Sequence, residues 1–159
     1  MKTRNYLLSI TVLLLLVCSA SAQRVTGVWR SDSAASTGPK AEVQKRTQPS
    51  MYFFTKSHYS IIFVNSDSPR STDDPKKMTV EQLNNAYVDE FTANAGSYDL
   101  KGDVLTLHPA IAKSPAYMAG GNWISYKVKA AGNTMTLTEV ATKDGPMKDP
   151  RILTFTRIE

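Results

Sequence analysis

Hydrophobic and polar residues alternate along most of the chain from position 24 onward, with the two-residue period of half-buried β-strands. Short turn-forming segments interrupt the alternation at 56–57, 101–102 and 131–133, and the last two contain glycine, which suits tight hairpin turns. The pattern predicts eight strands, at 24–31, 50–55, 58–65, 95–100, 103–109, 122–129, 134–141 and 151–158.

The first predicted hairpin has one strongly aromatic face. A turn at 56–57 places Phe54 opposite Tyr59 and Tyr52 opposite Ile61. These four residues share a face with Phe63, because residues two apart on a strand point the same way. We therefore expect this face to point toward the core.

The second predicted hairpin is also apolar on one side. A turn at 101–102 places Tyr98 opposite Leu105 and Gly96 opposite Leu107. The third hairpin and the last strand repeat the alternation, so every hairpin contributes one apolar face to a common interior.

Eight strands joined by consecutive hairpins predict an all-β protein with up-and-down strand order. A sheet of this size tends to curl, and closing it removes its exposed edges. We therefore expect an eight-stranded up-and-down antiparallel β-barrel, which is a size that can hold one small ligand.

One short α-helix is expected outside the barrel, at 79–91. Thr79 and Gln82 have the spacing of a capping box, and apolar residues recur near one face of the helix. Polar segments at 32–50 and 65–77 are interpreted as long connections. The fold prediction is thus a barrel with one short helix.

The first 22 residues have the features of a secretory signal peptide. Lys2 and Arg4 precede an apolar run of about 12 residues, and Ala-Ser-Ala at 20–22 suits signal peptidase. The run is shorter than the roughly 20 residues of a membrane-spanning helix, so we expect no permanent membrane span. An N-terminal membrane anchor and a lipoprotein attached at Cys18 are the alternatives. We expect residues 23–159 to form one exported domain, periplasmic or secreted.

The composition argues against several function classes. The chain has 19 basic and 14 acidic residues, and removal of Lys2 and Arg4 leaves 17 against 14. The basic residues are spread out, so we expect no nucleic-acid partner. Cys18 is the only cysteine, so the exported chain would have no disulfide and no thiol chemistry. We expect a monomer without cofactor or metal.

The two ends of the predicted barrel and three internal segments resemble a known family. Gly27-Val28-Trp29 opens the first strand and Arg157 closes the last, which resembles the signature of the lipocalin and wider calycin barrels. In that family the arginine packs over the tryptophan and closes one end of the barrel. The segments FTKSHYSIIFV, FTANAGSYDLKGDVLTLHP and YKVKAAGNTMTLT resemble the bacterial and fungal lipocalin-like domain family. The resemblance covers about 25–158 and implies ligand binding, with no catalytic residue.

The predicted interior is rich in tyrosine, and we expect it to bind a small hydrophobic molecule that the phenol groups orient. The candidate ligand-binding residues are Tyr52, Phe54, Tyr59, Ile61, Phe63, Tyr98, Tyr126 and Met118. Met118 belongs to segment 108–123, which we interpret as a lid over the barrel mouth or as an ordered Ω-loop. The alternative for the interior residues is a solid core without room for a ligand.

Two other functions remain open. A barrel enzyme of isomerase or cyclase type on an apolar substrate would need a general acid or base. His58 points away from the interior if Tyr59 faces it, and His108 lies at a strand end, so no catalytic residue is assigned. An envelope interaction or structural module would instead have a filled barrel and use its 32–50 and 65–77 loops as contacts.

Overall fold

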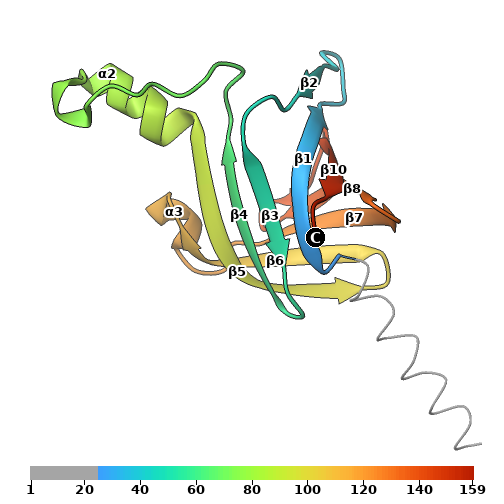
Figure 1. Cartoon of the computed structure of the whole chain (residues 1–159). Coiled ribbons are helices and arrows are strands. Elements are labelled where there is room, and N and C mark those ends of the chain that lie inside the picture. The colour runs from blue at the N-terminus through green and yellow to red at the C-terminus, as the bar shows by residue number, and fades with distance from the viewer. Residues whose placement is uncertain (1–24) are drawn as a thin grey trace, which may run out of the picture.

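The computed structural model describes residues 25–159, so the predicted signal peptide lies outside the described residues. Within this range the chain forms a closed antiparallel β-barrel with up-and-down order, which confirms the predicted fold class (Figure 1). β10 pairs with both β8 and β1 and thereby closes the sheet. Around the barrel the strands are β1 (Gly27–Ala35), β3 (Ser50–Phe54), β4 (His58–Val64), β5 (Phe91–Lys101), β6 (Val104–Ala112), β7 (Ile124–Ala131), β8 (Thr134–Thr142) and β10 (Ile152–Arg157).

Two very short strands extend the sheet at its margins. β2 (Val43–Lys45) pairs with β1, and β9 (Gly145–Pro146) pairs with β8. β1 itself continues to Ala35. The segment predicted as a connection, 32–50, is therefore partly strand.

The first hairpin has the predicted register. Phe54 pairs with Tyr59 and Tyr52 pairs with Ile61 across β3 and β4. Tyr52, Phe54, Tyr59 and Ile61 are buried on the inner face, and Phe63 is half-buried against them. His58 is exposed on the outside of the barrel. The interior face inferred from alternation is confirmed for this hairpin.

The predicted register of the second hairpin is wrong. Tyr98 pairs with Leu107 rather than Leu105, and Gly96 pairs with Pro109 rather than Leu107. The turn uses residues 102–103, because Gly102 supplies the positive φ (62°) that a two-residue turn needs. Each partner moves by two positions, so the same side chains still face inward.

The helical segment begins as predicted but packs differently. α2 (Val80–Leu83) continues into the π-helical turns η2 (Asn84–Asp89), preceded by the short 3₁₀ turn η1 (Pro75–Lys77). The capping box forms, with Gln82 N donating to Thr79 Oγ1 at 3.2 Å and Thr79 N donating to Gln82 Oε1 at 2.8 Å. The segment projects away from the start of β5 (Figure 1). Val80 is 75% exposed whereas Ala86 is buried, so the expected apolar face is only partly covered.

One end of the barrel is closed by packing. Trp29 and Phe155 are fully buried there, and the Arg157 guanidinium lies 4.1 Å from the centroid of the Trp29 ring. Arg157 Nη1 donates to the Thr26 carbonyl at 2.6 Å. A side chain at Gly27 would overlap Arg157, so glycine is required for this close approach. Among the described residues, no helix is long and apolar enough to span a membrane.

Candidate functional site

A cavity of about 600 Å³ lies in the barrel at the end opposite Trp29 and Arg157. The strand directions place it there, because its wall includes the later parts of β4 and β6 and the first parts of β5, β7 and β10. Its lining residues are Arg46, Tyr52, Ile61, Phe63, Asn65, Thr92, Ala93, Asn94, Leu107, Ala112, Lys113, Ser114, Ala116, Tyr117, Asn122, Ile124, Tyr126, Arg151 and Leu153.

The cavity wall has an ordered aromatic part. Tyr52 stacks against Phe63 with ring centroids 6.1 Å apart and planes 8° apart. Tyr52 also contacts Phe155 edge-to-face, with ring centroids 4.7 Å apart and planes 70° apart. Both geometries are favourable for aromatic pairs, so the Tyr52 ring is fixed between the core and the cavity.

Three phenol groups meet at the cavity. Burial raises the pKa of Tyr52 to about 12, although the charges of Arg46 and Arg151 oppose the shift. Burial also raises the pKa of Tyr126 and of Tyr117. All three phenols are therefore neutral at physiological pH and can donate hydrogen bonds. Within residues 25–159, no protein group accepts a hydrogen bond from these three hydroxyls.

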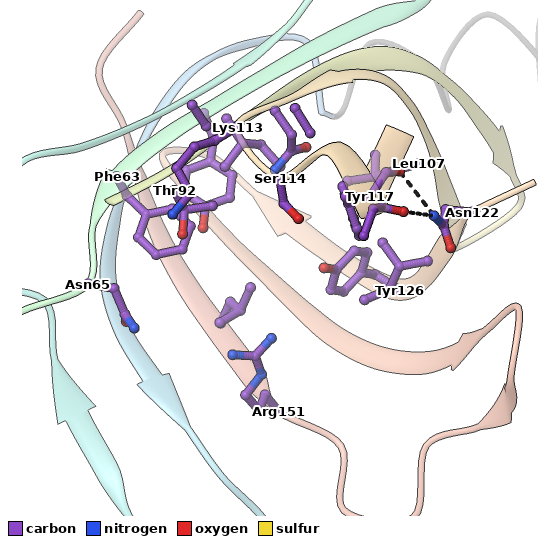
Figure 2. Close-up of a pocket in the computed structure, with 18 of the residues that line it drawn as sticks. Phe63, Asn65, Thr92, Leu107, Lys113, Ser114, Tyr117, Asn122, Tyr126 and Arg151 are labelled. Carbon is purple, nitrogen blue, oxygen red and sulfur yellow. Dashed lines mark hydrogen bonds between the residues drawn. The ribbon is translucent and has the colours of Figure 1, made fainter. Parts of the chain in front are cut away.

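Arg151 lies at the mouth of the cavity, held by a buried carboxylate. Glu139 on β8 is only 3% exposed and accepts three bonds from Arg151. The donors are Nε at 3.0 Å, Nη2 at 2.8 Å and the backbone N–H at 2.9 Å. The hydrogen bond to Glu139 raises the pKa of Arg151. Nη1 is not used by this pair, and Figure 2 shows the guanidinium directed into the space between Phe63 and Tyr126.

Arg46 supplies a second guanidinium. Its Cζ lies 5.1 Å from the centroid of Phe63, and its Nη1 donates to Asn65 Oδ1 at 2.5 Å. Partial burial lowers its pKa below the usual value, and the charge of Arg151 lowers it further. In the described part of the chain, no carboxylate oxygen lies within 4 Å of Arg46 to form an ion pair.

The short helix α3 (Pro115–Met118) closes one side of the cavity and presents Tyr117 to it. Asn122 Nδ2 donates to the carbonyls of Ala116 and Tyr117, both at 3.0 Å, and so ties the end of this helix (Figure 2). Just before it, Lys113 Nζ donates to the carbonyls of Val88, in η2, and of Phe91, the first residue of β5. The side chains of Lys113 and Asn122 therefore fix the shape of the rim.

The predicted ligand-binding residues separate into three groups. Tyr52, Ile61, Phe63 and Tyr126 line the cavity. Met118 does not line the cavity and is 41% exposed. Ile111, another residue of the predicted lid segment, is also exposed. Binding by any of these residues stays a prediction.

The remaining three predicted residues lie deeper, toward the closed end. Phe54 and Tyr98 contact edge-to-face at 5.6 Å, and the Tyr98 hydroxyl donates to the Thr55 carbonyl at 2.6 Å. Tyr59 is buried and burial raises its pKa, yet its hydroxyl has no hydrogen-bond partner among residues 25–159. None of the three lines the cavity.

The sequence reasoning missed the charged residues of the site. Arg151 and Glu139 carried a usable signal, because each lies two positions from a buried leucine on the same strand alternation, Leu153 and Leu137. Arg46 carried no such signal, since it lies in a connection whose path the alternation does not define.

Neither histidine is part of the site. His58 Nδ1 bonds Ser57 Oγ at 3.0 Å, and His108 Nε2 bonds Asp99 Oδ2 at 3.0 Å. Both lie outside the cavity lining. Across the described residues, no group of three histidine, cysteine or carboxylate side chains is placed to hold a metal ion.

Comparisons of this chain with family models, with curated proteins and with solved structures find no match. The geometry of the cavity is therefore the basis for interpreting the site.

Proposed function

We propose that this protein binds a small, largely apolar molecule non-covalently inside the barrel. The observation that carries the proposal is the cavity of about 600 Å³, since small-molecule sites typically have volumes of roughly 300 to 1,000 Å³. A module that acted only through its outer loops would have no use for a hollow interior.

The wall chemistry supports the same proposal. Ile61, Leu107 and Ile124 offer apolar area, and the phenols of Tyr117 and Tyr126 offer donors without a protein acceptor in the described range. A bound molecule with one or two polar atoms would satisfy these donors. Nothing favours catalysis to the same degree, because the described lining contains no histidine or carboxylate to serve as general base.

Membership of the lipocalin-like family is part of the proposal. The contact of Arg157 with Trp29, next to Gly27, is the arrangement that the resemblance implies. Export to the periplasm or the medium, after removal of residues 1–22, is proposed on the leader-like sequence alone. A carrier or sensor outside the cytoplasm would combine these features.

The test is native mass spectrometry of the exported protein, purified without denaturation and then exposed to an extract of lipids and small metabolites. We expect a discrete excess mass that disappears on denaturation. The variant Ala112→Trp should abolish it, because Ala112 lines the cavity and an indole would occupy the space. Ala110→Trp, at an exposed position of the same strand, is the matched control and should retain it.

Two results would contradict the proposal. One is a bare chain mass that takes up nothing from the extract. The other is an adduct that persists equally in Ala112→Trp, because such a ligand would be bound outside the cavity.

A further inference from the structure

The cavity lining is positively charged. Arg46, Lys113 and Arg151 contribute three cations, and no aspartate or glutamate belongs to the described lining. An apolar ligand alone would give no reason for cations at this position, since burying a charge against hydrocarbon is costly.

The three cations differ in how far the protein already satisfies them. Arg151 is paired with the buried carboxylate of Glu139, and Lys113 donates to backbone carbonyls. Arg46 has only a neutral partner, Asn65 Oδ1. Asp67 attracts Arg46 weakly but forms no ion pair with it, and instead accepts a hydrogen bond from Gln44 at 3.2 Å. Arg46 is therefore the cation whose charge is least balanced.

The charges of the two guanidinium groups influence the same part of the cavity wall. The charge of Arg151 lowers the pKa of Arg46, and both cations act on the Tyr52 phenol between the core and the cavity. Like charges at one cavity repel, and an anion placed between them would remove the repulsion and restore the solvation that Arg46 lost on burial. Guanidinium groups bind oxyanions with paired N–H donors, which makes two of them a suitable receptor.

We propose that the ligand is an amphipathic organic acid whose oxyanion lies between Arg46 and Arg151 at the cavity mouth. This inference rests on the proposed function and specifies its ligand class. The neutral Tyr52 phenol lines the same cavity as both cations and is the additional donor to the head group. The apolar body extends inward along Ile61, Leu107 and Tyr126, which line the deeper wall.

The test is isothermal titration calorimetry with two matched series of probes. One series is decanoate, methyl decanoate and decan-1-ol, and the other is 2-naphthoate, methyl 2-naphthoate and 2-naphthol. In at least one series we expect the acid to bind about tenfold or more tightly than its two neutral analogues, because a hydrogen bond to a charged group contributes more than a neutral one. The advantage of the acid should shrink as salt is raised.

Single substitutions locate the head group. Arg46→Gln should weaken binding of the acid by about 10- to 100-fold and leave binding of the neutral analogues unchanged. Arg30→Gln is the matched control, because Arg30 lies outside the barrel and is paired with Asp32. Arg151→Lys keeps a cation beside Glu139 but removes the fork, and we expect it to fold and to weaken acid binding as well. Thermal melting of each variant verifies that it is folded.

The outcomes separate the inference from the proposed function. Equal affinity for acids and neutral analogues would overturn the head-group inference and leave the binding cavity standing. The head-group inference would also be overturned if Arg46→Gln weakened all probes alike or none of them. Absence of binding by all six probes would count against both the ligand class and the proposed function.

Discussion

The buried phenols link the cavity to the stability of the fold at alkaline pH. Tyr52 is 5% exposed, and its pKa is raised to about 12, while the unfolded chain has the ordinary value near 10. Above pH 10 the unfolded state therefore binds fewer protons than the folded state, and stability falls as pH rises from 10 to 12. A shift of two units corresponds to about 2–3 kcal/mol for Tyr52. Urea unfolding at pH 9 to 12 should show this loss.

The variant Tyr52→Phe tests the assignment. It should be less stable or similar at pH 8, yet should lose less stability between pH 10 and 12 than the parent chain. Tyr87, which is 45% exposed on the projecting helix, gives the control Tyr87→Phe. We expect the control to keep the parental pH slope. Identical slopes for all three proteins would show that the Tyr52 phenol is accessible in the folded state.

At the scale of elements, the β5–β6 hairpin depends on one glycine. The pairing shifts between Ala95 and Gly96, and a Cβ at Gly96 would overlap the backbone carbonyl of His108 on the partner strand. Backbone cannot move aside as a flexible side chain can, so Gly96→Ala should cost more than about 2 kcal/mol in unfolding free energy. Gly102→Ala is the control, with open space around it but a positive φ, and should cost only about 1 kcal/mol. Equal costs would refute the close-approach argument.

Alternation in the sequence defines the strands because each side chain must face either core or solvent. Alternation identifies the inner aromatic residues of β3 and β4 correctly, because it defines which side chains face the core. It does not detect the two-residue slip between β5 and β6, because such a slip leaves the same side chains facing inward. It fails where packing decides instead. The sequence predicts a strand end at Pro109, but β6 continues to Ala112. Proline is tolerated inside this strand because it lies at the irregular pairing opposite Gly96, where the hydrogen-bond ladder is already interrupted.

The helix illustrates the other limit. Thr79 and Gln82 form a local capping box that any environment permits, so sequence spacing predicts it. Whether Val80 meets another element depends on the path of the whole chain, and here the helix projects from the barrel. Periodicity alone contains no information about that path.

For the molecule as a whole, the two ends of the barrel differ in packing and charge. The end with Trp29 and Phe155 is filled, and the end with Arg46 and Arg151 is hollow and cationic. The aromatic half of the cavity follows from strand parity. The cationic rim does not, because Arg46 and Lys113 come from connections whose positions depend on closure of the barrel. The predicted lid segment, 108–123, is partly strand, because β6 continues to Ala112.

Because the two ends of the barrel differ in this way, we expect substitution of an arginine at the closed end to lower stability, and substitution of an arginine at the hollow end to lower ligand affinity. Arg157→Ala removes the cation–π contact with Trp29 and the bond to the Thr26 carbonyl, so it should cost about 2 kcal/mol. For a domain of this size that lowers the melting temperature by about 5 °C. Ligand affinity should change by less than about threefold, because Arg157 lies at the end of the barrel away from the cavity. The affinity is measured by calorimetry with the tightest-binding probe acid, well below the new melting temperature. Arg46→Gln should do the reverse. A large loss of affinity in Arg157→Ala at unchanged melting temperature would place the ligand at the closed end instead.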